Sequence, residues 1–135
     1  MEIKRDIYLN RLITRKQNGF IKVITGIRRC GKSYLLNKIF YNYLLSEGVD
    51  ENHIIRFAFD SADDLLLIDE DILGISEQNR KVDPRKFMKY ISGKIVDDEM
   101  YYLLLDEVQL LGNFEAVLNG YMRKDNLDIY VTGSN

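Results

Sequence analysis

The sequence predicts an α/β fold: a three-layer α/β/α sandwich in which helices cover both faces of a mainly parallel sheet. Two observations support this expectation. Short runs of β-branched and aromatic residues alternate with segments of helical periodicity, as in domains built from strand–helix–strand units. A glycine-rich segment at residues 26–33 stands between the first strand and the helix after it. With 135 residues the chain is expected to form one domain, residues 1–135.

The first half of the chain contains an amphipathic helix, two strands and the helix between those strands. The first helix is expected at residues 6–16, where apolar residues share one side. Residues 20–25 and 54–59 are short, apolar and partly β-branched, which is typical of buried strands. Apolar residues recur at helical spacing from residue 32 to about 46, and Gly48 can end that helix.

The second half contains two more strands, each preceded by a helix or an irregular segment. Residues 60–82 are acidic and weakly periodic, so a loop or short irregular helices are expected there. An Asp-Pro pair at 83–84 is a good helix start. Strands are expected at 101–105 and 128–132, and Asn113 is expected to cap the helix between them.

The glycine-rich segment reads G-x-x-x-x-G-K-S, the phosphate-binding loop of P-loop NTPases. Gly26 and Gly31 let the backbone turn so that N–H groups point at phosphate oxygens. Lys32 is expected to reach the β- and γ-phosphates of ATP, and the Ser33 hydroxyl to bind Mg²⁺. The residues predicted to bind the nucleotide are Gly26, Ile27, Arg28, Arg29, Cys30, Gly31, Lys32, Ser33 and Tyr34.

A second motif, an apolar strand that ends in two carboxylates, has two candidates, residues 65–70 and 101–107. Only five residues separate the first candidate from the preceding strand, and a parallel crossover needs a dozen or more. The second candidate is therefore favoured, with Asp106 as the Mg²⁺ ligand and Glu107 as the group that polarises the attacking water. The first candidate is expected to be an amphipathic turn.

Polar residues near the end of the fourth strand are weaker candidates. Asn135 or Ser134 is positioned to sense the γ-phosphate or to fix the water, and Asn135 joins Glu107 and Lys32 as a predicted catalytic residue. A helix cap or turn is the alternative for both. Asp60, at the end of the second strand, is a candidate restraint on Glu107, although a turn aspartate is favoured.

Composition limits the cellular setting and the partners. The longest apolar runs fall short of a membrane span, and the N-terminus lacks the apolar core of a signal peptide. Cys30 is the only cysteine, so an internal disulfide is excluded. A cytoplasmic protein without membrane contact is expected. The first 45 residues are basic, which makes nucleic acid a conceivable partner, but no nucleic-acid-reading motif supports it.

Three segments together resemble a known family: T-G-I-R-R-C-G-K-S at 25–33, L-L-D-E-V-Q at 104–109 and V-T-G-S-N at 131–135. They are similar to the AAA-superfamily predicted ATPases of bacteria and archaea. The opening at residues 3–8 shares the resemblance. The resemblance implies an AAA/ASCE-type P-loop core, followed by a winged-helix region and a nuclease-like C-terminal domain of unknown function.

The resemblance also implies that this core is incomplete at its C-terminus, an N-terminal fragment. The strand at 128–132 would insert between those at 20–25 and 101–105, and the edge beside 20–25 would stay open. Because an open edge offers unpaired backbone groups, self-association is expected. AAA-type sites are completed by a lid and by an arginine of a neighbouring subunit, so slow ATP turnover is expected of the fragment alone.

The expected function is ATP binding and Mg²⁺-dependent hydrolysis that is coupled to an unknown partner or domain. Two alternatives stay open. One is a nucleotide-dependent switch or binding module with little hydrolysis of its own, against which the carboxylate at Glu107 argues. The other is a small-molecule kinase, but nothing after the second strand indicates the acceptor pocket that a kinase needs.

Overall fold

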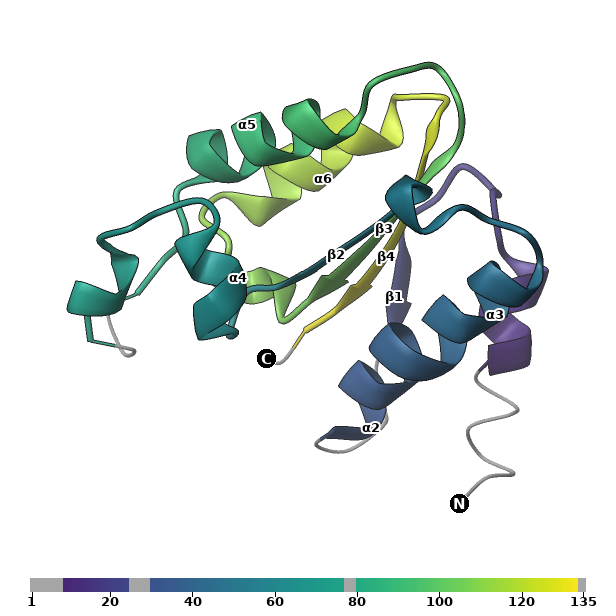
Figure 1. The fold of residues 1–135 in the computed structure, drawn as a ribbon, viewed down its shortest axis with the longest axis horizontal. Helices are drawn as coiled ribbons and strands as arrows, with labels where there is room; N and C mark the ends of the chain where they lie inside the picture. Colours follow the sequence, from purple (N-terminus) through teal and green to yellow (C-terminus); the bar gives the residue numbers. More distant parts are fainter. Residues whose placement is uncertain (1–8, 25–29, 77–79, 134–135) are drawn as a thin grey trace.

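Four parallel strands form the sheet, and helices cover both of its faces (Figure 1). The computed structural model describes residues 9–24, 30–76 and 80–133. The strands are β1 (Lys22–Ile24), β2 (Ile54–Ala58), β3 (Tyr101–Asp106) and β4 (Leu127–Thr132). They lie in the order β1-β4-β3-β2, and all neighbours pair in parallel. The predicted α/β sandwich is confirmed, and β4 lies between β1 and β3, as the resemblance implied.

The two helical layers come from different parts of the chain (Figure 1). On one face α2 (Cys30–Tyr34), a π-helical segment (Leu35–Phe40) and α3 (Tyr41–Ser46) follow one another without a break. On the other face lie α5 (Pro84–Lys94) and α6 (Phe114–Met122). Every residue of β3 and β4 is buried, because parallel strands between two helical layers have no solvent-facing side.

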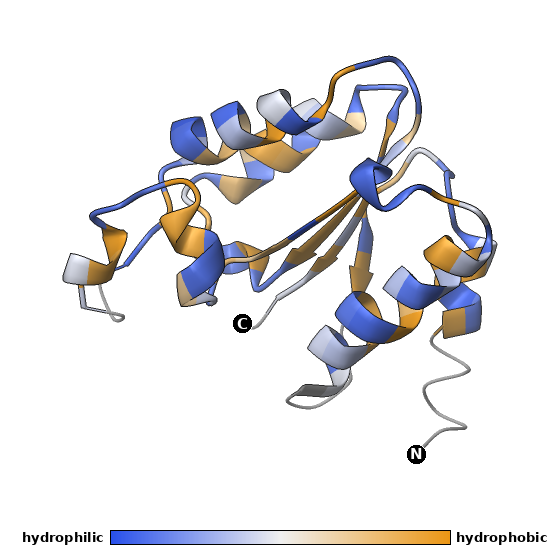
Figure 2. Cartoon of the chain, in the orientation of Figure 1, coloured by the Kyte–Doolittle hydropathy of each residue, from blue (hydrophilic) through white to orange (hydrophobic). Residues whose placement is uncertain are grey.

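Each face of the sheet has its own apolar core. On the α5/α6 face, Phe57 and Phe87 pack with ring centroids 5.3 Å apart. On the α2/α3 face, Phe40 packs against Tyr130 at 4.4 Å. Figure 2 shows the central strands mainly in orange and the outer side of α5 mainly in blue, so the strands supply the shared centre of both cores.

Both predicted cap residues stand at the start of their helices, but only Asp83 caps through its side chain. The Asp83 carboxylate accepts the Arg85 N–H at 2.9 Å, so α5 begins where the Asp-Pro pair predicts. Asn113 precedes α6, but its backbone is left-handed, with φ of 52°, and its side chain makes no capping hydrogen bond. Asn113 is thus the N-cap residue, as predicted, but it contributes through its backbone: its carbonyl oxygen accepts the Val117 N–H at 3.3 Å.

The competing acidic segment at residues 65–70 is not a strand. Its first leucines belong to α4 (Ala62–Leu66), which Ser61 caps by accepting the Asp64 N–H. Leu65 is buried, whereas Leu66 and Leu67 are exposed. A short 3-10 turn, Ile72–Gly74, follows. These elements fit the short irregular helices predicted for the acidic stretch, although the segment at 65–70 starts as helix and not as the expected amphipathic turn. Of the two candidate segments the later one is the strand, which ends at Asp106.

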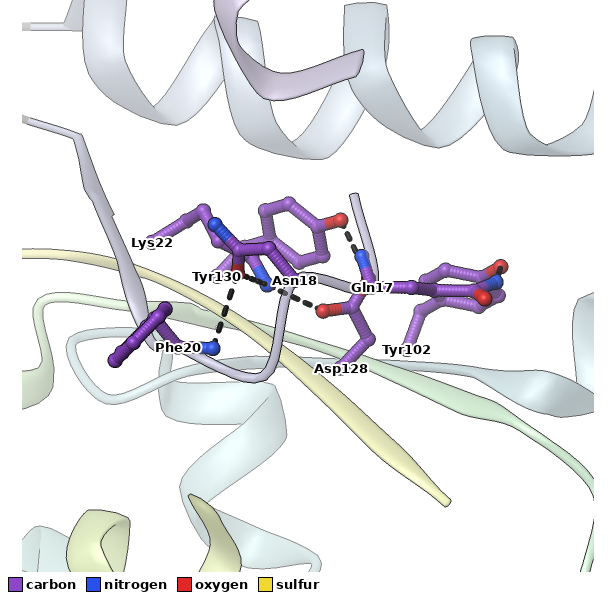
Figure 3. Close-up of polar contacts among 7 residues, drawn as sticks. All are labelled: Gln17, Asn18, Phe20, Lys22, Tyr102, Asp128 and Tyr130. Carbon is purple, nitrogen blue, oxygen red and sulfur yellow. Dashed lines mark hydrogen bonds and ion pairs between the residues drawn. The ribbon is translucent and has the colours of Figure 1, made fainter. Parts of the chain in front are cut away.

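A buried polar cluster joins the segment before β1 to the amino ends of β3 and β4 (Figure 3). Lys22 and Asp128 form an ion pair in which both side chains are buried. Asp128 also accepts the Tyr130 hydroxyl at 2.6 Å and the Gln17 backbone N–H at 2.9 Å. The Gln17 amide group donates to the Tyr102 hydroxyl at 2.6 Å. These bonds fix the turn that brings the N-terminal helical residues 9–14 onto the sheet.

Strand β1 is an edge of the described sheet. Among the described residues Lys22–Ile24 pair with β4, so β1 begins two residues later than the predicted strand at 20–25, whose last residue lies outside the described part of the chain. Beside it Phe20 and Val23 are 66% and 59% exposed, which leaves apolar surface next to unpaired backbone groups. The expected self-association through this edge stays a prediction.

Two buried tyrosines of the core provide a matched test of hydrogen bonding. Among the described residues the Tyr121 hydroxyl has no hydrogen-bond partner, and burial raises the pKa of Tyr121 to about 12. We therefore expect Tyr121→Phe to leave the free energy of unfolding unchanged or to raise it by less than about 1 kcal/mol. Tyr130→Phe should lower it by about 1.5–3 kcal/mol, because it removes a donor to the buried Asp128 carboxylate. Urea unfolding of both variants measures the difference, and equal losses would contradict this account.

Candidate functional site

The carboxyl edge of the sheet brings together residues from α2, β3 and β4. Lys32 and Ser33, the last two residues of the glycine-rich segment, lie in α2. Asp106 ends β3 and Thr132 ends β4, the neighbouring strand. Ligands of open parallel sheets bind outside the carboxyl ends of the strands. The two motifs that the sequence analysis singled out thus meet at one place.

Asp106 is held by two hydroxyl groups. The Ser33 Oγ donates to Asp106 Oδ2 at 2.7 Å, and the Thr132 hydroxyl donates to Asp106 Oδ1. Asp106 is buried, and Thr132 has no exposed surface. Both oxygens of the Asp106 carboxylate therefore have fixed directions. One of them faces Ser33, the residue that the loop motif predicts to bind Mg²⁺ together with Asp106.

Glu107 stands outside β3 in a left-handed backbone conformation, with φ of 56° and ψ of 51°. Its backbone N–H donates to Thr132 Oγ1 at 3.0 Å, and its carboxylate accepts the Gln109 side-chain N–H at 2.7 Å. Such a conformation costs a non-glycine residue about 1–3 kcal/mol, so the surrounding contacts must maintain it. The direction of the Glu107 side chain is set by this turn and by Gln109, and not by strand alternation.

Lys32 bridges two parts of the site. Its Nζ donates to the Gly133 carbonyl oxygen at 2.8 Å. This contact ties the start of α2 to the residue that follows β4. Because the ammonium group has three donors and a flexible stem, it can leave this carbonyl for a stronger acceptor such as a phosphate.

A third carboxylate adds to the negative charge at this edge. Partial burial raises the pKa of Asp60, and the nearby Asp106 and then Glu107 carboxylates raise it further. Asp60 follows β2, which pairs with β3 on the side opposite β4, so it reaches the site from that side. The suggested restraint of Glu107 by Asp60 stays a prediction, and the Glu107 carboxylate accepts a hydrogen bond from the Gln109 side chain.

The oxygens at this edge suit a hard divalent cation. Mg²⁺ prefers carboxylate and hydroxyl oxygens, and Ser33 and Asp106 offer both within hydrogen-bonding distance of each other. The mutual repulsion that raises the Asp60 pKa is of the kind that a bound cation relieves. The donor set therefore fits the predicted metal.

Several predicted site residues lie outside the described residues. They are Gly26, Ile27, Arg28 and Arg29 of the loop, and Ser134 and Asn135 at the end of the chain. Cys30, Gly31 and Tyr34 lie in α2 beside Lys32 and Ser33. Thr132 is a site residue that the sequence analysis missed. A hydroxyl residue that ends the strand next to the acidic strand is the signal that could have indicated it.

Another group of described residues could hold a metal ion. The ligand atoms of His53, Asp97 and Glu99 all lie within 4.8 Å of one another. This group sits before β2 and β3, at the edge of the sheet opposite Asp106. Asp97 and Glu99 are exposed, and exposed acidic groups often gather without a metal.

The chain is similar to a known domain family and to a protein of another organism. A family model described as an AAA domain matches residues 18–135. An uncharacterized protein of Haemophilus influenzae is 34% identical over 134 residues, or 98% of this chain. The chain spans 30% of the length of that relative. Within the described residues, no helix is both long and apolar enough to cross a membrane.

Proposed function

The chain belongs to the AAA domain family, whose members are nucleotide-binding P-loop ATPase-type domains, and we propose that it binds ATP with Mg²⁺ and hydrolyses ATP to ADP and phosphate. The observation that carries this proposal is the set of contacts that joins the loop motif to the acidic strand. Ser33 of α2 reaches Asp106 of β3, and Lys32 of α2 reaches Gly133, the residue after β4. A lysine, a hydroxyl and two carboxylates at the carboxyl edge are what phosphoryl transfer to water requires.

Different residues bind the phosphates and activate the water. Lys32 binds the β- and γ-phosphates and offsets the charge that develops on the transferred group. Glu107 orients a water molecule toward the γ-phosphate and accepts its proton. Asn135 or Ser134 is proposed as the further contact with the γ-phosphate or that water.

Ser33 and Asp106 would hold Mg²⁺. When it is bound, this ion neutralises charge on the β- and γ-phosphate oxygens. Asp106 suits this role because its two hydroxyl partners already fix its carboxylate. The carboxylate therefore loses little conformational freedom when the ion binds.

The contact between Lys32 and Gly133 favours a second function, that of a nucleotide-dependent switch. If Lys32 leaves the Gly133 carbonyl to bind a phosphate, the residue after β4 loses this contact. Binding alone would then alter the end of the central strand.

Replacing Glu107 separates hydrolysis from binding. We expect Glu107→Gln to retain Mg²⁺-dependent ATP binding and to lower the rate of phosphate release by about 10²–10⁴-fold, because an amide cannot accept the proton of the attacking water. Phosphate release and ATP binding by calorimetry are measured side by side in the intact protein.

The matched control is Glu70→Gln, which changes the acid of the competing segment. Glu70 is exposed and follows α4, so this variant should resemble the wild type in both assays. An inactive Glu70 variant would show that the wrong acidic segment has been assigned. A Glu107 variant with normal phosphate release would show that Glu107 is not the base. A wild type that binds ATP without releasing phosphate would leave the switch as the better proposal.

A further inference from the structure

We propose that Thr132 is a positioning residue whose single hydroxyl sets the orientation of both acids of the site. This inference rests on the proposed function, since it assigns a purpose to contacts around Asp106 and Glu107. The hydroxyl donates to Asp106 Oδ1 and accepts the Glu107 backbone N–H at 3.0 Å. The two residues that it contacts have different proposed roles, one in holding Mg²⁺ and the other in activating water.

The sheet register brings Thr132 to this place. β3 and β4 pair in parallel, and Leu105 lies opposite Val131, so the next residue of each strand falls at the same level. Those residues are Asp106 and Thr132. β4 is also held on its other side, where Ile24 of β1 pairs with Thr132. The Thr132 backbone is therefore fixed from both neighbours.

The side chain is as constrained as the backbone. Thr132 has no exposed surface, and a β-branched side chain in a strand has few accessible rotamers. Its hydroxyl offers one proton, which Asp106 receives, and lone pairs, one of which faces the Glu107 N–H. Because water has no access to Thr132, no solvent molecule can replace the hydroxyl if it is removed.

Two consequences follow for the acids. With Oδ1 of Asp106 held by Thr132, the other oxygen, Oδ2, is directed at Ser33 Oγ, 2.7 Å away. With its N–H held by the same hydroxyl, Glu107 keeps the left-handed turn that takes it out of the strand. Thr132 thereby couples the geometry of the proposed metal site to that of the proposed base.

Two substitutions at this position test the proposal. Thr132→Val keeps the shape and removes the hydroxyl, whereas Thr132→Ser keeps the hydroxyl and removes a methyl group. The first readout needs neither metal nor nucleotide: amide hydrogen exchange at Glu107. Exchange should accelerate in Thr132→Val, because the N–H loses its acceptor, and should stay near the wild-type rate in Thr132→Ser.

The second readout is the gain in ATP affinity that Mg²⁺ produces, measured by calorimetry on the intact protein with Mg²⁺ and with EDTA. Loss of a partner that orients a metal-binding carboxylate typically costs about 10–100-fold. We expect Thr132→Val to lose about that factor of the Mg²⁺-dependent gain while affinity in EDTA is unchanged. Thr132→Ser should retain the gain.

The outcomes separate this proposal from the proposed function. If the wild type shows no Mg²⁺-dependent ATP binding, both fail. If the wild type binds and Thr132→Val matches it in exchange and in Mg²⁺-dependent gain, Thr132 has no positioning role. Equal losses of affinity with Mg²⁺ and with EDTA would show a merely structural residue. Should Thr132→Val not fold, a folded Thr132→Ser variant that loses the gain contradicts the proposal by itself.

Discussion

Lys22→Met is expected to lower the free energy of unfolding by about 3–5 kcal/mol, a large share of the roughly 5–15 kcal/mol that stabilises a typical domain. The substitution leaves the Asp128 carboxylate buried without its cation. Asp128 keeps the Tyr130 hydroxyl and the Gln17 N–H, but neutral donors do not compensate a buried charge fully. Loss of the lysine also removes its contact over the Tyr130 ring, 4.8 Å from the ring centroid.

Lys86→Met is the matched control, because it removes the same kind of side chain from another lysine–aspartate pair. Lys86 and Asp69 are 48% and 16% exposed, whereas Lys22 and Asp128 are 4% and 2% exposed. Water screens the exposed pair, so its loss should destabilise the protein much less than loss of the buried pair. Urea unfolding compares the two variants with the wild type. If both variants lost the same small amount of unfolding free energy, the buried pair would be no more stabilising than the exposed one.

The ion pair between Lys22 and Asp128 could not be predicted from the sequence. Lys22 and Asp128 are far apart in the chain, and they meet because β4 inserts next to β1. Nothing local to either residue indicates the other. By charge alone Lys22 is one of several cations in a basic segment, and Asp128 is an acid at the start of a strand.

The order of elements could be predicted, because local patterns determine it. Periodicity identified α5 and α6, and the Asp-Pro pair located the start of α5 to the residue. The crossover argument chose the acidic strand correctly, since α4 occupies the competing segment. Where backbone geometry departs from regular elements, the patterns failed: Asn113 and Glu107 both adopt left-handed conformations that no periodicity indicates.

The site was predicted where chemistry is tied to a motif and missed where it depends on strand neighbours. Lys32, Ser33, Asp106 and Glu107 follow from the loop and from the acidic strand. Thr132 acquires its contacts only through the register of β3 and β4, in which Leu105 lies opposite Val131. A sequence pattern indicates which residues end strands, but pairing decides which of those ends touch.

Lys32→Ala is expected to abolish binding of ATP while the fold is retained. Under the proposed function, the ammonium group makes charge-assisted hydrogen bonds to two phosphates, and each is worth about 1.5–3 kcal/mol. Their loss corresponds to a fall in affinity of about a hundredfold or more. The loss of the bond to the Gly133 carbonyl should cost little stability, because that bond joins a flexible side chain to a partly exposed strand end.

Lys38→Ala provides the control for Lys32→Ala within the same helical segment. Lys38 lies in the π-helical segment after α2 and is exposed. It has the same charge as Lys32 and lies on the same face of the sheet, but it is not at the carboxyl edge of the sheet. Calorimetry with ATP should show wild-type affinity for Lys38→Ala and none for Lys32→Ala, with circular dichroism spectra unchanged in both.

If the two variants lost affinity equally, the basic character of the first 45 residues, and not a specific phosphate contact, would account for binding. Unchanged affinity in a folded Lys32→Ala variant would remove the lysine from the site, and the proposed function would lose its phosphate-binding residue.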